Sequence, residues 1–78
     1  MAKRPTHRMP KDVRAAIGSA GVDGDYRARP PYQRNDYVGW VDAAKSEATR
    51  KRRIAKMVDE LKRGGVYMGM THRPSAKG

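Results

Sequence analysis

Four consecutive cations, Arg50-Lys51-Arg52-Arg53, are the residues in this sequence best suited to a chemical task. Glu47 is the acid nearest to them, and Lys56 follows one helical turn after Arg52. Cations near the beginning of a helix oppose its dipole, at a cost of about 0.3–1 kcal/mol each. The free N–H groups of a helix beginning, together with concentrated positive charge, suit an anion such as phosphate. We therefore predict anion binding by Arg50, Lys51, Arg52, Arg53 and Lys56.

A structural role is the alternative for part of this charge. Arg50 projects near the edge of the apolar side of its helix, so it could pair with a carboxylate of another helix, such as Asp36 or Asp42. Farther along, two oppositely charged pairs stand four residues apart, Lys56 with Glu60 and Asp59 with Arg63. This spacing predicts a solvated, salt-bridged surface in that half of the helix.

The whole chain is strongly basic, with 18 Lys/Arg against 8 Asp/Glu and a net charge of +10. The excess comes mainly from residues 1–14, with five cations and one acid, and from residues 45–63, with eight cations and three acids. A field of this size recruits polyanions, nucleic acid first and anionic membrane second. Lys3, Arg4 and Arg8 of the N-terminal segment therefore join the predicted nucleic-acid-binding residues.

Catalytic chemistry is not indicated. The sequence has no cysteine and no glycine-rich loop with the spacing of a phosphate-binding motif. His7 and His72 fall in segments predicted to be flexible ends, where lone histidines are usually inert, and Ser46 suits a helix cap better than a nucleophile. We expect a protein that is not an enzyme and that uses no cofactor and no metal.

Three helices must position these residues. Each shows apolar residues at i, i+3, i+4 and i+7, the pattern of one buried helix face. The stripes are Val13, Ala16, Ile17 and Ala20 in a helix over residues 10–20; Tyr37, Trp40, Val41 and Ala44 over 31–44; and Ile54, Met57, Val58 and Leu61 over 47–63.

Helix boundaries are marked by residue type. Pro10 suits the first turn of the first helix and Gly21 its end, while Pro31 opens the second helix. Ser46 suits the N-cap of the third helix, and Gly64-Gly65 supplies a left-handed C-terminal stop.

The remaining segments lack periodicity. Residues 1–9 are predicted to be a flexible basic arm, 21–26 a loop by their turn chemistry, and 66–78 a C-terminal tail. Within the tail, Val66–Met70 could cover the core or form a short extended piece. The predicted fold class is all-α: one small three-helix domain over residues 10–65 with flexible ends.

The order of several short motifs resembles the YdeI/OmpD-associated family, also called the bacteriocin-protection or OmdA-type family. The matching residues are Met9-Pro10, Tyr37-Val-Gly-Trp40, Ala44-Lys45, Thr49-Arg50, Arg53-Ile54-Ala-Lys56, and Leu61 with Gly64. The resemblance covers Met9 to Gly65, while the Gly- and Asp-rich loop Ser19–Arg29 departs from the family pattern and the tail has no counterpart in it. The resemblance implies the family's C-terminal helical module and a loose association with envelope stress and outer-membrane protein regulation.

We therefore expect a bacterial binding module that contacts DNA or RNA through phosphates; a ribonucleoprotein component is one concrete form. The alternative is a regulatory module that binds an acidic protein partner in a stress response. Binding to anionic membrane is weaker as a hypothesis, because the core uses the apolar side of the helix. No apolar run approaches the ~20 residues that span a bilayer, so we expect a cytoplasmic protein without a membrane span. The oligomeric state stays open.

Overall fold

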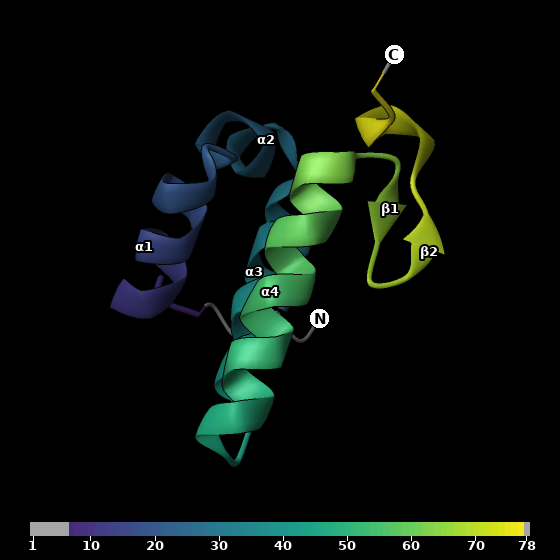
Figure 1. The fold of residues 1–78 in the computed structure, drawn as a ribbon. Coiled ribbons are helices and arrows are strands. Elements are labelled where there is room, and N and C mark those ends of the chain that lie inside the picture. Colours follow the sequence, from purple (N-terminus) through teal and green to yellow (C-terminus); the bar gives the residue numbers. More distant parts are fainter. Residues whose placement is uncertain (1–6, 78) are drawn as a thin grey trace.

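The computed structural model describes residues 7–77. Four α-helices come first, then a two-stranded antiparallel sheet and a short 3-10 helix (Figure 1). Their bounds are α1 Lys11–Ala20, α2 Asp23–Ala28, α3 Pro31–Asp42, α4 Glu47–Arg63, β1 Val66–Tyr67, β2 Met70–Thr71 and η1 Arg73–Ser75.

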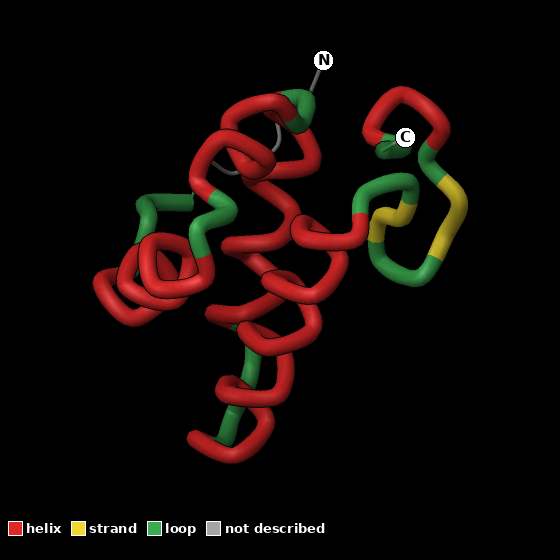
Figure 2. Tube along the Cα trace, turned by 45° about the horizontal axis from the view of Figure 1, so that its top comes forward, coloured by secondary structure: helices red, strands yellow, loops and turns green. Residues whose placement is uncertain are grey.

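Helix α4 is the centre of the fold. It contacts α1, α2 and α3, and it also contacts strand β1 of the hairpin. Figures 1 and 2 show the three other helices on one side of α4 and the β1–β2 hairpin with η1 on another. The long helix therefore packs against both the helical part of the fold and the C-terminal hairpin.

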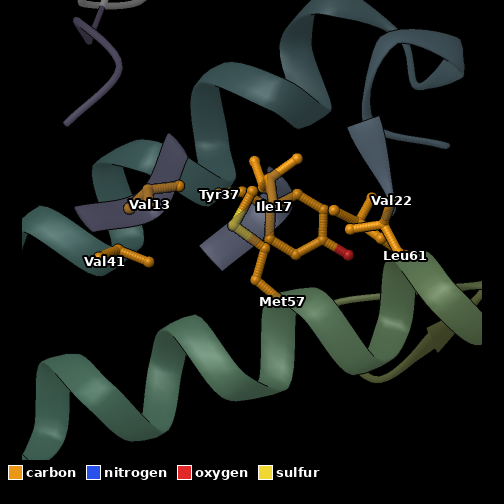
Figure 3. Packing of buried hydrophobic residues seen from close by; sticks show 7 residues of the cluster. All are labelled: Val13, Ile17, Val22, Tyr37, Val41, Met57 and Leu61. Atoms are coloured by element: carbon orange, nitrogen blue, oxygen red, sulfur yellow. The ribbon is translucent and has the colours of Figure 1, made fainter. Parts of the chain in front are cut away.

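The core lies where α4 meets the other helices (Figure 3). It is formed by residues with at most 3% of their surface exposed: Val13, Ile17, Val22, Tyr37, Val41, Met57 and Leu61. The predicted stripes supply six of these seven residues, and Val22 comes from the predicted loop. Burial of such side chains stabilises a fold by about 1.5–3 kcal/mol each, so this small cluster carries much of the stability.

Helix α4 occupies the predicted residues because both of its ends are capped. The Ser46 side chain accepts a hydrogen bond from the Thr49 N–H at 3.2 Å. At the other end Gly64 and Gly65 both have a φ of 70°, a conformation that costs other residues energy. Gly64 has a ψ of 169°, so this residue does not adopt the predicted left-handed helical conformation, although its N–H still bonds to the Glu60 carbonyl oxygen. Within the stripe, Met57 is fully buried, but Ile54 and Val58 are only half-buried.

The first and third helices differ slightly from their predicted bounds. Pro10 lies at the N-cap of α1 rather than in its first turn. Gly21 ends α1 in the left-handed conformation, with φ 69° and ψ 27°, as its residue type predicts. Helix α3 begins at Pro31 and ends at Asp42, two residues before the predicted end.

The segment predicted to be a loop contains a helix, α2. Asp23 and Asp25 lie in its first turn, where negative charge favours the helix dipole, and Arg27 pairs with Asp23 at 2.7 Å. Val22, which directly precedes α2, is buried and fixes its start against the core. Six residues with no apolar stripe give no periodic signal, so the helix depends on its charges and on this anchor.

The C-terminal segment differs most from the prediction, and the fold is not purely α-helical. Strands β1 and β2 pair antiparallel, with Val66 opposite Thr71 and Tyr67 opposite Met70. In place of a flexible tail, the chain after β2 folds back on the helices: the Lys77 ammonium pairs with Asp25 at 2.9 Å.

The N-terminal arm is also in contact with the helices where the structure describes it. The His7 N–H donates to Asn35 Oδ1 at 2.7 Å, and the His7 ring lies over Gly39. A Cβ at Gly39 would stand 2.6 Å from His7 Nε2, so the glycine permits this approach. Lys3 and Arg4, predicted to bind nucleic acid, lie outside the described residues.

Candidate anion-binding face

The structure divides the predicted cation cluster into two groups, internal and external. Arg50 belongs to the internal group: its Nε and one terminal nitrogen donate to the Asp12 carboxylate at 2.6 and 2.9 Å. Its other terminal nitrogen donates to Asp42 at 2.9 Å. The side chain is 21% exposed, and it ties α4 to α1 and to the end of α3. Arg50 therefore has a structural task.

Of the two carboxylates considered from sequence, Asp42 is thus a partner of Arg50. Asp36 instead accepts a hydrogen bond from the Tyr67 hydroxyl at 2.6 Å. The main partner, Asp12, lies 38 residues away and was missed, because nothing in the sequence shows that α1 lies beside the start of α4.

The Arg50 pair makes stability depend on pH. The hydrogen bond from Arg50 lowers the pKa of Asp12 from its usual 3.8. Because the folded-state pKa lies below the unfolded-state value, the pair stabilises the fold fully above pH 3.8, and this is lost as pH falls through the lowered pKa. We expect Asp12→Asn to lower the melting temperature at pH 7 and to lower it much less at pH 2. Thermal unfolding followed by circular dichroism at both pH values measures the difference, and an equal loss at both would contradict the pairing.

Arg53 is the second internal cation. One of its terminal nitrogens donates to the Trp40 carbonyl oxygen at 2.7 Å, and its guanidinium lies 5.3 Å from the centroid of the Trp40 ring. This contact is a cation–π interaction, and it joins α4 to α3. The predicted phosphate contact for Arg53 would have to compete with both interactions, so we leave Arg53 and Arg50 out of the external group.

The external group faces solvent along α4. Its cations are all exposed: Lys51, Arg52, Lys56, Lys62 and Arg63. At about 100° per residue, they fall on the side of α4 opposite Met57. We call these five residues the basic face. Lys51, Arg52 and Lys56 are among the residues predicted to bind an anion. Lys62 and Arg63 are not, although helical spacing places them on the same side.

Acids do little to neutralise the basic face. Asp59 lies on it and pairs with Arg63 at 3.1 Å, as the spacing predicted. The predicted partner of Lys56, Glu60, does not lie on this surface, because it is 2% exposed. In the described part of the chain, no carboxylate forms an ion pair with Lys51, Arg52, Lys56 or Lys62.

Glu60 instead accepts three hydrogen bonds inside the fold. The Tyr37 hydroxyl donates to it at 2.6 Å, and the N–H groups of Met68 and Gly69 each donate at 2.8 Å. Burial, and then this contact with Glu60, raise the pKa of Tyr37. The prediction of a solvated Lys56–Glu60 pair is wrong, because the hairpin covers Glu60 and its N–H groups satisfy it.

A further arginine is internal as well. Arg29, 3% exposed, donates to Gln33 Oε1 and to the Glu60 carbonyl oxygen, each at 3.2 Å. A buried arginine keeps its charge, so these acceptors replace the water it has lost. Arg8, the remaining predicted site residue, is exposed just before α1, on a different element from the basic face.

His72 is half-buried rather than at a flexible end. Its Nδ1 lies 2.8 Å from Ser75 Oγ, and the same Oγ donates to the His72 carbonyl oxygen and accepts from the Gly65 N–H. A hydroxyl engaged this way fixes the turn between β2 and η1. Across residues 7–77, no three His, Cys, Asp or Glu side chains come together as a metal site would require. The same residues include no helix that is long and apolar enough to cross a membrane.

Comparison with known proteins identifies a family. The family model described as "Bacteriocin-protection, YdeI or OmpD-Associated" matches residues 6–64, which include all four helices and end before β1. Searches of the curated proteins and of the solved structures give no match. The matched region covers most of the chain and agrees with the motifs between Met9 and Gly64 that suggested this family from sequence. The chain therefore belongs to the YdeI/OmpD-associated, or bacteriocin-protection, family.

Proposed function

We propose that this chain is a non-enzymatic module that binds the phosphate backbone of nucleic acid through the basic face of α4. One observation carries the proposal: the face holds five exposed cations and one acid. Folding neutralises other positive charge, since Arg50 has two carboxylate partners and Arg27 has one. It leaves four cations of the basic face without an ion pair among the residues described.

The net charge of the described residues adds to the positive charge of the basic face. Lys3 and Arg4 lie outside residues 7–77, so this part of the chain carries 16 of the 18 Lys/Arg and all eight Asp/Glu. Several of the acids are already engaged, Asp12 and Asp42 with Arg50 and Glu60 with the hairpin. A positive field therefore surrounds the fold, and it accelerates encounter with a polyanion before any specific contact forms.

The geometry of the basic face fits an extended phosphate backbone. Arg52 and Arg63 are 11 residues apart on α4, about 16 Å along the helix axis at 1.5 Å per residue. Duplex DNA carries a negative charge about every 1.7 Å of its axis, so several phosphates come within reach. Contacts of this kind give affinity without reading sequence.

Binding of this kind depends steeply on salt. We expect the chain to bind both a generic duplex DNA and a structured RNA at low salt, since phosphates are common to both. The logarithm of the binding constant should fall with the logarithm of salt concentration, with a slope of about −0.9 for each duplex phosphate contacted. Fluorescence anisotropy with labelled DNA and RNA at several salt concentrations measures the slope. Absence of binding at low salt would end the proposal.

A further inference from the structure

A groove between α1 and α4 is the second surface feature of α4. It has a volume of about 440 Å³ and an almost entirely apolar lining. Its walls are Ala16, Ser19 and Ala20 from α1, and Lys51, Ile54, Ala55 and Val58 from α4. The two helices lie side by side there (Figure 1).

The groove lies where the apolar stripe of α4 is incompletely covered by α1. Ile54 and Val58 belong to the predicted core stripe, yet both are only half-buried. The α1 side chains beside them are two alanines and a serine, which are too short to cover them. Small residues on both walls also allow another backbone to approach closely. A third helix laid into the groove would bury Ile54 and Val58 as core residues are buried.

The charges along the groove restrict what can occupy it. On α4, Lys51, Ala55, Val58 and Lys62 follow one another at intervals of four, three and four residues, so they form one line along the helix. The middle of this line is small or apolar, and both ends are lysines that lack a carboxylate partner in the described structure. Asp12 is the acid of α1 on this side, and Arg50 neutralises it. The matching surface is therefore apolar in its centre and acidic at its ends.

Two other occupants fit this pattern poorly. A second copy of the chain would bring a further net charge of +10, and its α4 would face lysines with lysines. The chain's own first six residues contain Lys3 and Arg4 and no acid, so they would also be repelled. Nucleic acid has charge complementary to the lysines but lacks the apolar side chains that would cover Ile54 and Val58.

We propose that the groove docks an amphipathic helix of an acidic protein partner, with its apolar side on Ile54 and Val58 and its acids on Lys51 and Lys62. The spacing of the α4 line is the same read in either direction, so a partner helix can run parallel or antiparallel to α4. This docking shares Lys51 and Lys62 with the basic face, but it also needs the apolar walls, so variants of Ala55 and variants of Arg52 and Lys56 distinguish it from nucleic-acid binding.

A designed peptide tests the proposal. The probe is a helical peptide whose acidic, leucine, leucine and acidic side chains repeat the spacing of Lys51, Ala55, Val58 and Lys62; a version with lysines for the acids is the control probe. Ala55→Phe fills the groove from an exposed position, and Ala15→Phe makes the same change on the outer surface of α1. We expect the acidic peptide to bind the wild-type chain in calorimetry. Ala55→Phe should weaken this binding about tenfold or more, and Ala15→Phe should change it less than about twofold.

Reversing the charges of the two groove lysines provides a second test of the proposal. The double variant Lys51→Glu/Lys62→Glu should lose the acidic peptide and gain the lysine peptide. No binding of the acidic peptide at low salt, or equal binding by the Ala55→Phe and Ala15→Phe variants, would overturn the proposal. So would sedimentation showing that the free chain self-associates and that Ala55→Phe prevents it. Loss of duplex DNA binding in Ala55→Phe would assign the groove to nucleic acid instead. Loss of DNA binding in variants of Arg52 and Lys56 bears on the basic face alone.

Discussion

Reversing two charges of the basic face, with Arg52→Glu and Lys56→Glu together, is expected to abolish duplex DNA binding at moderate salt and leave the fold intact. Both side chains are exposed and form no ion pair in the described part of the chain, so their replacement costs little stability. Each removed phosphate contact should reduce the salt slope by about one, and the introduced glutamates repel the backbone. We expect affinity to fall by more than about tenfold, measured by fluorescence anisotropy.

A matched double variant makes this result specific to the basic face. Lys11→Glu/Arg73→Glu changes the net charge equally at exposed positions of α1 and η1. It should weaken binding only slightly, because only the general field is reduced. Equal losses in the two double variants would show that net charge, rather than the basic face, determines affinity. Arg50 is an unsuitable target, because a glutamate there would face Asp12 and Asp42 and would destabilise the protein.

Removing the Glu60 carboxylate should have the largest effect on stability. Glu60→Ala leaves three donors without their acceptor: the Tyr37 hydroxyl and the N–H groups of Met68 and Gly69. A buried donor left without an acceptor costs about 1–3 kcal/mol, so three of them amount to a large part of the stability of so small a domain. We expect a chain that is largely unfolded at room temperature, or one in which the hairpin has separated from α4.

Urea denaturation measures the loss, and amide exchange at Met68 and Gly69 shows whether the hairpin separates first. Glu60→Gln keeps one carbonyl acceptor but presents an amide N–H to a donor, so its loss should be intermediate. Asp59→Ala is the matched control, because Asp59 is the neighbouring acid and its pair with Arg63 is exposed. That variant should lose less than about 0.5 kcal/mol. Similar losses for Glu60→Ala and Asp59→Ala would contradict the internal role of Glu60.

The helices were predictable because their signals are local. The extent of α4 follows from the Ser46 cap, the amphipathic stripe and the glycines at its end, and all of these lie within the helix or beside it. Helix α2 has no stripe and contains Gly24, so its turn-forming residues were interpreted as a loop. The two acids in the first turn of α2 favour a helix, but this effect is decisive only because the buried Val22 anchors the start of the helix.

The hairpin could not be predicted for a different reason. Its two central residues, Met68 and Gly69, both have positive φ, at 51° and 80°. Two-residue hairpin turns of this kind usually carry Asn-Gly or Asp-Gly, and a methionine is disfavoured in the first position. Here the conformation aims two consecutive N–H groups at Glu60, which offsets the cost. The turn is thus specified by a residue of α4 and not by its own sequence.

The candidate site was also only partly predictable from the sequence. Sequence reasoning located the cations of α4 correctly, and the helical spacing separates their sides. It could not decide which cations the fold would use, because Asp12 lies 38 residues from Arg50 and the Trp40 carbonyl belongs to α3. Arg50 and Arg53, two of the predicted anion-binding residues, instead join α4 to other helices, and for Arg50 this is the structural role considered from the sequence as the alternative.

The contact between Glu60 and the hairpin crosses the boundary of the family match. The family match ends at residue 64, so the matched region contains the four helices but not the hairpin. Glu60 lies inside that region, but the backbone donors that satisfy it lie beyond it, at Met68 and Gly69. A chain cut at the family boundary would keep every matched motif, but it would lose two of the three hydrogen-bond donors to Glu60 and the hairpin that covers this carboxylate. In this member, the surroundings of a residue inside the matched region therefore depend on the segment that follows it.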